Sequence, residues 1–415
     1  MDSASIIKAP EGTPATARRF LKALSDGVAP QSQLTRWLTV GQEKLLAKFE
    51  EDLESTERGQ FCNLLLLGNP GVGKSQLLIT LQYLAIEGGF VTAYFSQDIQ
   101  SGLAFNRPDL VYQRIIETMR LPQDPDRTFD PLRKILDDWV DVCLPKLRGT
   151  NRSMTIAYKL GEISLLPSNV VGIPTRTRLA LVGYIMATEQ QNEEAKIQFL
   201  NVIRGPGLTN TCLLETAQSV RLHRKGFMGY TPSAYDSVYY FGQIKTLIFI
   251  LRVLGYRGMV TLFDEVTAII DLGSRSRKKA YEVLDSLFFN EHKCEGLYAV
   301  FAYMPAFINQ LRADRSYVDE DYVQRWSTFW DQQMREIESL DGNQLDELLR
   351  RLAYLHSIAR SWPAWSIVAN DAKALIKEHQ REGLPIRDLV RKGLDLLDQR
   401  NIKYQASSHF KGMAL

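Results

Sequence analysis

The sequence predicts an α/β fold with a parallel sheet, a long and mostly helical insertion, and a helical domain at the C-terminal end. Short apolar runs alternate with segments whose apolar residues recur at helical spacing, which is typical of a parallel sheet with helices on both faces. About 135 residues, 100–235, interrupt this alternation. So long a stretch cannot be an ordinary connection and must fold as an insertion, for which we expect mostly helices. After residue 343 only helical spacing remains.

The first elements follow from apolar spacing. Residues 15–24 and 42–53 carry apolar side chains at helical intervals, with the turn-forming residues 26–30 between them. Residues 61–67 form an apolar run that ends at a glycine, which predicts a buried strand. Residues 76–86 then predict a helix, and residues 90–95 a second strand.

The alternation resumes beyond the insertion. Residues 236–254 predict a helix, and residues 259–263 predict the strand that follows it. A helix over 278–289 leads to a strand over 297–302, and a fifth strand is predicted over 333–337.

These elements divide the chain into consecutive parts. We expect an N-terminal lead-in with two helices over 1–60 and an α/β core over 61–340, into which residues 100–235 are inserted. A small helical domain is expected over 341–403, followed by a loose tail over 404–415.

Composition restricts the kind of protein. The chain has 50 basic and 48 acidic residues and a formal charge of +2, so any nucleic-acid or membrane site must be local. The four cysteines lie far apart, which argues against a disulfide framework or a cysteine metal site. The first residues do not resemble a secretory signal, and the most apolar segments, 179–187 and 247–251, are too short to span a membrane. We therefore expect a soluble, cytoplasmic protein.

A phosphate-binding loop is the clearest motif. Residues 68–75 read GNPGVGKS and fit G-x-x-x-x-G-K-[ST] completely, between a predicted strand and a predicted helix. Backbone N–H groups and the helix N-terminus would surround the phosphates, Lys74 would reach the β and γ phosphates, and Ser75 would ligate magnesium. An incidental glycine-rich turn is the alternative, and the complete match in this context argues against it. The expected nucleotide-binding residues are Gly68, Asn69, Pro70, Gly71, Val72, Gly73, Lys74, Ser75 and Gln76.

Two carboxylates follow the strand predicted over 259–263. In a parallel sheet its carboxyl end lies beside the phosphate-binding loop, so Asp264 is expected to hold magnesium. Glu265 would polarise the attacking water, because hydrolysis needs an in-line nucleophile. Strands also end in acidic residues simply where they reach solvent, but the nearby phosphate-binding loop favours the catalytic interpretation.

The joined set of motifs resembles the AAA+ branch of P-loop ATPases and, more closely, the small ATP-binding proteins of bacterial BREX phage-defence systems. The resemblance extends over about residues 17–398. It rests on the long insertion and on the segments TVGQEKLL, LLLLGNPGVGKSQLL, GYRGMVTLFDEVTAI, SRSRKKAYEVLDSL, GLYAVFAYMPAF and LPIRDLVRKGLDLLD. It implies an AAA+-type core and makes the C-terminal helical domain a lid over the nucleotide.

The resemblance also implies roles for single residues. Gly41 falls in the segment that AAA+ relatives place near the adenine, where their usual arginine is Gln42 in this chain. Tyr303 falls at the end of the fourth strand, where relatives carry a small polar residue that senses the γ-phosphate. Arg387 matches the lid arginine that contacts the γ-phosphate, although an arginine on a lid surface can also be a solvated charge.

AAA+ proteins commonly insert an arginine from a neighbouring subunit, which implies a homo-oligomer. In this chain Arg312, Arg315 and Arg325 fall in the interval between the fourth and fifth strands that carries it. Arg325 lies closest to the fifth strand and is the preferred candidate. A planar, permanently charged guanidinium suits the charge of a phosphoryl transition state.

The insertion is locally basic. Residues 146–230 contain eleven basic and five acidic residues, an excess of +6 in a chain whose net charge is +2. Such a surface can bind phosphate backbones without reading sequence, and the candidates for a DNA contact are Arg148, Arg152, Arg176 and Arg178. A solvated face or a protein-docking surface is the equal alternative.

Three functional interpretations remain open. The leading one is a magnesium-dependent ATPase that hydrolyses ATP to ADP and phosphate and acts as a switch on DNA or partner proteins in phage defence. A nucleotide-binding regulatory adaptor with little turnover would explain Gln42 and Tyr303. A DNA-loading ATPase of the replication-initiator or transposition-regulator type would share the same core.

Overall fold

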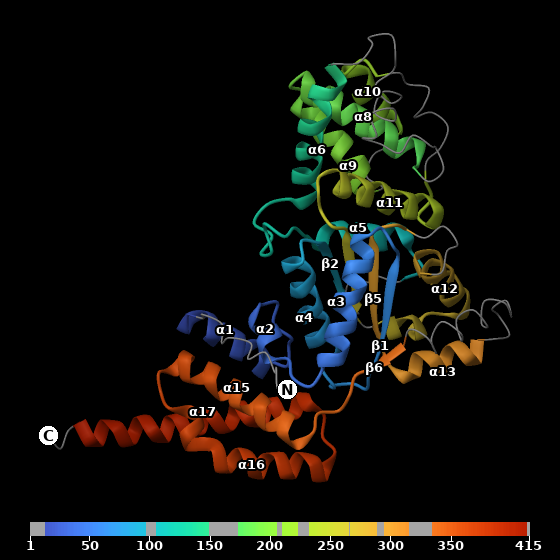
Figure 1. The fold of residues 1–415 in the computed structure, drawn as a ribbon. Coiled ribbons are helices and arrows are strands. Elements are labelled where there is room, and N and C mark those ends of the chain that lie inside the picture. The colour runs from blue at the N-terminus through green and yellow to red at the C-terminus, as the bar shows by residue number, and fades with distance from the viewer. Residues whose placement is uncertain are drawn as a thin grey trace.

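The computed structural model describes residues 13–96, 105–148, 173–205, 210–222, 232–264, 266–288, 294–314 and 334–412. Their centre is a six-stranded sheet in the order β3-β2-β4-β5-β1-β6 (Figure 1). Its strands are β1 Cys62–Leu67, β2 Val91–Ser96, β3 Met119–Arg120, β4 Met259–Asp264, β5 Leu297–Tyr303 and β6 Met334–Glu336. All pairs are parallel except β2 with β3. The expected α/β class and the five expected strands are confirmed, whereas the short antiparallel β3 carries too few residues to show a pattern.

The two faces of the sheet bury alternate residues of each strand. In β4, Val260 and Leu262 pack toward α3 Glu43–Glu57 and α4 Lys74–Glu87, while Met259 and Phe263 belong to the core on the opposite face. Successive side chains of a strand point to opposite faces, and a strand buried on both faces therefore reads as a continuous apolar run.

The insertion is helical and continues the second of these cores. It contains α5 Pro108–Thr118, α6 Pro131–Arg148, α8 Thr175–Glu189, α9 Glu193–Arg204 and α10 Asn210–Ser219. The chain returns to the sheet through α11 Ser237–Val253. Buried residues of α6, α8 and α9 join those of β2 and β5 in one apolar cluster, so the insertion packs continuously onto the core (Figure 1).

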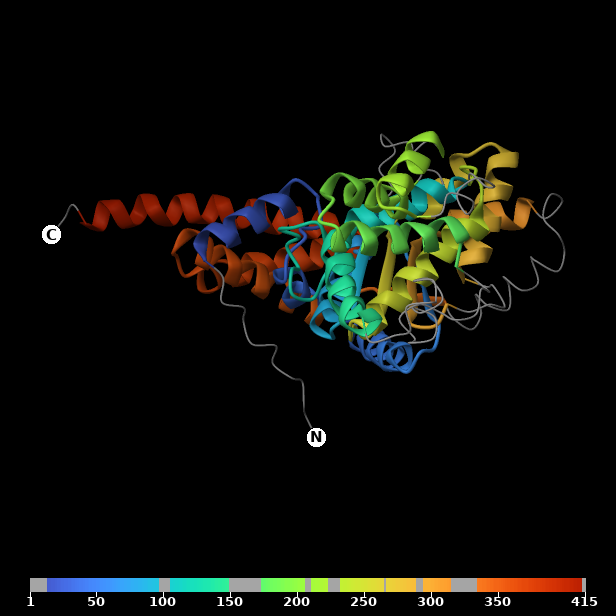
Figure 2. The same ribbon diagram turned by 90° about the horizontal axis from the view of Figure 1, so that it is seen from above.

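The two ends of the chain share a separate apolar core. Helices α1 Pro14–Ser25 and α2 Leu34–Leu38 pack against α15 Gly342–Arg360, α16 Ala364–Glu382 and α17 Ile386–Gly412 (Figures 1 and 2). We call these five helices the terminal helical unit. The loose tail expected from residue 404 is wrong as far as residue 412, because α17 continues without a break and extends away from the body.

The remaining helices flank the carboxyl end of the sheet. The 3₁₀ helix η3 Val266–Asp271 and α12 Ser274–Phe288 follow β4, and α13 Pro305–Ala313 follows β5. Among the described helices, none combines the length and the apolar character that a membrane crossing requires.

Candidate functional site

A cavity of about 410 Å³ is lined by residues at the carboxyl end of the sheet and by residues of the terminal helical unit. One set of lining residues comes from residues 68–75, called the P-loop below, from the start of α4, from the ends of β4 and β5, and from η3. We call this set the polar wall, because it contains the polar side chains of Lys74, Ser75, Gln76, Asp264 and Thr267. Its other members are Pro70, Gly71, Val72, Gly73 and Met304. The other wall is mainly apolar and includes Val28, Ala29, Leu38, Val40, Ile337, Leu340, Leu348 and Val390. Polar groups and apolar side chains that line one cavity match a nucleotide, which has phosphates at one end and a flat base at the other.

The P-loop connects β1 to the first turn of α4. Gly71 and Gly73 have φ angles of +77° and +102°, which a residue with a Cβ rarely adopts. At Gly68, an added Cβ would lie 2.7 Å from Val72 Cγ1. These glycines allow the loop to turn tightly, so that the backbone N–H groups at the start of α4 remain available to an anion.

Lys74 begins α4 and is almost buried, with 9% of its surface exposed. Its Nζ donates hydrogen bonds to the carbonyl oxygens of Gly68, at 2.9 Å, and Asn69, at 3.0 Å. The ammonium is therefore held inside the loop, where a phosphate would lie beside it.

Asp264 ends β4 on the cavity wall and is 3% exposed. Its Oδ2 accepts a hydrogen bond from the Tyr94 hydroxyl at 2.8 Å. Among the described residues, its Oδ1 has no hydrogen-bond partner. A buried carboxylate oxygen is costly without a partner, and together with the Ser75 hydroxyl it fits the oxygen ligands that magnesium takes.

The described residues do not include the expected catalytic glutamate or two of the three candidates for the interface arginine. Glu265, Arg315 and Arg325 lie outside the described residues. Arg312 is exposed near the end of α13.

Arg387, which the resemblance identified as a candidate lid arginine, lines the cavity at the start of α17. Its backbone N–H donates to the Gly71 carbonyl oxygen at 3.3 Å. An added Cβ on Gly71 would lie 2.7 Å from Pro385 Cβ. The first turn of α17 therefore rests directly on the P-loop.

The segment from Val40 to Gln42, which was expected near the adenine, contributes two residues to the cavity. Val40 and Gln42 line the cavity, and Gly41 between them has a φ of +71°. The Gln42 Nε2 donates to the Glu338 carbonyl oxygen at 3.1 Å. Gln42 thus ties this segment to the chain that follows β6.

Sequence patterns did not indicate most of the apolar wall or Thr267. Val28 and Ala29 follow α1, while Leu348 and Val390 come from α15 and α17. These residues are more than 300 positions apart and become neighbours only through the terminal helical unit. Each of them reads locally as an ordinary core or turn residue, so no local signal was available.

Tyr303 does not line the cavity. It is 2% exposed, and its ring packs edge-on against Phe307 with centroids 6.0 Å apart. Burial raises the pKa of its hydroxyl. Its carbonyl oxygen accepts a hydrogen bond from the Gly68 N–H at 3.2 Å, and the following residue, Met304, lines the cavity.

The basic residues of the insertion differ in their availability. Arg176 is only 7% exposed, and burial lowers the pKa of its guanidinium, so little of its surface is available to a DNA phosphate in this conformation. Arg178 is half-buried. The side chain of Arg148 and the whole of Arg152 lie outside the described residues.

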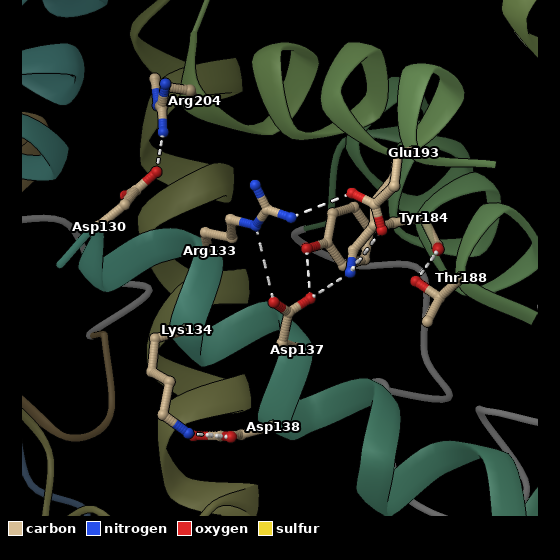
Figure 3. A network of polar contacts seen from close by, with 10 residues as sticks. Asp130, Arg133, Lys134, Asp137, Asp138, Tyr184, Thr188, Glu193 and Arg204 are labelled. Carbon is tan, nitrogen blue, oxygen red and sulfur yellow. Dashed lines mark hydrogen bonds and ion pairs between the residues drawn. The ribbon is translucent and has the colours of Figure 1, made fainter. Parts of the chain in front are cut away.

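Several other charges of the insertion are used within it (Figure 3). Asp137 accepts a hydrogen bond from the Tyr184 hydroxyl at 2.7 Å and pairs with Lys196 at 2.8 Å. Arg133 pairs with Glu193 at 3.0 Å, and Arg204 pairs with Asp130. Asp137 in α6 and Asp130 just before it thus neutralise Lys196 and Arg204, two of the basic residues counted over 146–230.

A family model described as BREX system ATP-binding protein BrxC/D matches residues 13–412. A search among curated proteins found no match. The match spans nearly the whole chain, including the P-loop, the insertion and the terminal helical unit. The resemblance seen in the sequence is thereby confirmed, and the chain belongs to the BREX system ATP-binding protein BrxC/D family.

Proposed function

We propose that this protein binds ATP with magnesium in the cavity and hydrolyses it to ADP and phosphate. The observation that carries the proposal is the buried Asp264, whose Oδ1 lacks a partner among the described residues and lies on the same polar wall as Lys74 and Ser75. Such a set is suited to a metal-bound triphosphate. The membership in an ATP-binding family supports it.

Each residue has a distinct role in this proposal. Lys74 neutralises the β and γ phosphates, and the N–H groups of the P-loop orient them. Ser75 and Asp264 would hold magnesium, which would supply positive charge to offset the charge of the phosphates. Glu265 orients and polarises the attacking water, and Arg387 stabilises charge on the γ-phosphate from the side of α17.

We further propose that nucleotide binding acts as a conformational switch in phage defence. Bound ATP would contact both the core and the terminal helical unit, because both line the cavity. A ligand that binds one arrangement better than another shifts the population toward it. The output would be oligomerisation, with Arg325 entering a neighbouring site, and action on DNA or partner proteins.

A nucleotide-binding adaptor with slow turnover is the second candidate. The burial of Tyr303 favours it, because this residue stands where relatives carry the γ-phosphate sensor and does not line the cavity. Both candidates require ATP binding, so the hydrolysis rate separates them. A DNA-loading ATPase would require that duplex DNA stimulate this rate.

Calorimetry and a steady-state ATPase assay, each with and without duplex DNA, test the proposal. Lys74→Ala should lose most of its ATP affinity, since the phosphates lose their point-charge partner. Lys134→Ala is the matched control, because Lys134 pairs with Asp138 on the surface of α6. Equal ATP affinity in Lys74→Ala and the control would contradict the assignment of the P-loop. ATP binding without measurable hydrolysis would favour the adaptor.

A further inference from the structure

We propose that the Thr267 hydroxyl positions the γ-phosphate end of bound ATP, in the role that the sequence suggested for Tyr303. The inference rests on the proposed ATP site. Thr267 is buried on the polar wall of the cavity, two residues after Glu265. Neither its type nor its position had drawn attention in the sequence.

The sheet topology places Met304, the hydrogen-bond partner of Thr267, between the segments that follow β1 and β4. β5 lies between β1 and β4, so the segments that leave the carboxyl ends of these three strands are adjacent. Met304 follows β5, and η3 with Thr267 follows β4. In P-loop proteins the lysine of the loop and the acidic strand both serve the terminal phosphates, and Thr267 and Met304 line the same cavity as Lys74 and Asp264.

One hydrogen bond fixes the orientation of the Thr267 side chain. The Met304 backbone N–H donates to Thr267 Oγ1 at 2.9 Å. The oxygen therefore acts as an acceptor on that side, and the hydroxyl hydrogen remains to be donated. Within the described part of the chain, that hydrogen has no acceptor. A phosphate oxygen can only accept, so its chemistry complements a hydroxyl held in this way.

Arg277 links the C-terminal ends of η3 and α13. Arg277 donates from Nε and Nη2 to the two carboxylate oxygens of Asp314, at 2.8 and 2.9 Å. Its Nη1 donates to the carbonyl oxygen of Leu272, just beyond η3. Asp314 follows α13 directly and also accepts from the Tyr281 hydroxyl at 2.9 Å.

η3 and α13 are thus tied together at both ends, by Thr267 with Met304 at the cavity and by Arg277 with Asp314 away from it. A hydroxyl fixed in this way would lose little conformational freedom when it binds a phosphate oxygen, which is the condition for an efficient contact. The arrangement predicts a contribution that ATP receives and ADP does not.

The alternative is a purely structural hydrogen bond between η3 and α13. In that case, removal of the hydroxyl would lower stability but would weaken ATP and ADP binding equally. The ratio of the two affinities therefore distinguishes the interpretations.

The test measures the dissociation constants of ADP and of a non-hydrolysable ATP analogue, both with magnesium, by calorimetry on the full chain. Thr267→Val removes the hydroxyl at nearly constant shape, and Thr267→Ser is the matched control that retains it. A hydrogen bond to a charged group contributes roughly tenfold to a hundredfold in binding. Thr267→Val should therefore lower the preference for the ATP analogue by about that factor, while ADP binding and the preference of Thr267→Ser stay near the parent values. Thr267→Ala provides the same comparison if Thr267→Val does not fold.

Parental preference for the ATP analogue in the variants without the hydroxyl would overturn the inference, as would an equal loss of affinity for both nucleotides. Neither result would affect the P-loop assignment, which Lys74→Ala tests separately. If the parent hydrolyses no ATP, the proposed hydrolysis fails, and the ratio of binding affinities still decides the role of Thr267.

Discussion

Two side chains of the polar wall, Asp264 and Thr267, are each held by one hydrogen bond that leaves a second polar atom available to a ligand. Tyr94 hydrogen-bonds one oxygen of Asp264, while the second oxygen has no partner among the described residues. In the same way, the Met304 backbone N–H donates to Thr267 Oγ1, and the hydroxyl hydrogen of Thr267 remains available for donation. Such fixed groups can favour a charged ligand because they need little rearrangement when it binds.

The first prediction at the residue scale concerns Glu265. Glu265→Gln should bind ATP and magnesium with nearly parental affinity but turn over slowly, because the amide keeps the shape and cannot act as a base. General-base catalysis contributes about 10² to 10⁴ in rate, which bounds the expected loss. Steady-state hydrolysis and calorimetry on the same preparation would measure both quantities.

Glu295→Gln is the matched control, because Glu295 is an exposed glutamate at the opposite end of β5 from the cavity. Parental turnover in Glu265→Gln would show that Glu265 takes no part in hydrolysis.

Contacts between elements determine how the terminal helical unit is held. At the cavity, the first turn of α17 contacts the P-loop through Gly71. Farther along, buried His356 of α15 contacts both the connection between α15 and α16 and the helix α17. Trp362 Nε1 donates to His356 Nδ1 at 2.8 Å, and His356 Nε2 lies 3.1 Å from Asp398. Because Nδ1 accepts, this arrangement requires the neutral imidazole with its hydrogen on Nε2.

The terminal helical unit should consequently lose stability in acid. Burial lowers the pKa of His356, while Asp398 acts to raise it and Arg360 to lower it. The unfolded chain therefore binds a proton before the folded chain does. The stabilisation is complete above the unfolded value of about 6.5 and is lost as the pH falls below it. The melting temperature should fall between pH 7.5 and pH 5.

His356→Gln should melt lower than the parent at pH 7.5 and show a smaller decrease toward pH 5. Burial also lowers the pKa of His379, so His379→Gln measures the contribution of this second histidine. An unchanged pH dependence in His356→Gln would contradict the assignment.

At the scale of the whole molecule, the cavity joins parts that come from both ends of the chain. The core provides the polar wall, and the terminal helical unit provides much of the apolar wall. A nucleotide between them can transmit its state to surfaces far from the site. The proposed oligomer and DNA contact are possible outputs of this coupling.

Mixing two inactive variants tests the oligomer. If Arg325 acts across a subunit interface, Arg325→Ala mixed with an excess of Lys74→Ala should regain hydrolysis, because each variant supplies the group that the other lacks. An arginine finger contributes about 10³ to 10⁵ in rate in other phosphoryl-transfer systems, which bounds the loss in Arg325→Ala alone.

The complementation requires that subunits exchange, which light scattering on the mixed sample would monitor. A monomer at all concentrations, with activity strictly linear in protein, would contradict the proposed interface.

The DNA contact is now proposed for a smaller set of arginines. With Arg176 buried, Arg148, Arg152 and Arg178 remain as candidates. The affinity for duplex DNA should fall with salt, and Arg148→Ala combined with Arg152→Ala should flatten the log–log slope by up to about two, since each contact contributes about 0.9. Fluorescence anisotropy over a salt series would measure this.

Arg133→Ala combined with Arg204→Ala removes the same charge from residues that are paired within the insertion (Figure 3). Equal slopes in the two double variants would contradict a specific contact and would favour a protein-docking role for the insertion.

The sequence by itself determined the elements whose signals are local. The P-loop is recognisable because its glycine, lysine and serine positions are fixed by the phosphates that such a loop binds. Five strands were predictable because they are buried on both faces and form continuous apolar runs. Asp264 followed from the same logic, since parallel strands bring their carboxyl ends to one edge of the sheet.

Only the tertiary structure decided which of these elements meet and which polar groups remain accessible. An amphipathic helix shows that one face is buried but not which helix covers it, so the union of α1 and α2 with α15, α16 and α17 could not be predicted. The same limit applies to single residues. Tyr303 and Arg176 are buried and Thr267 lines the cavity because of neighbours distant in sequence, and burial by such neighbours leaves no trace in a residue's local pattern.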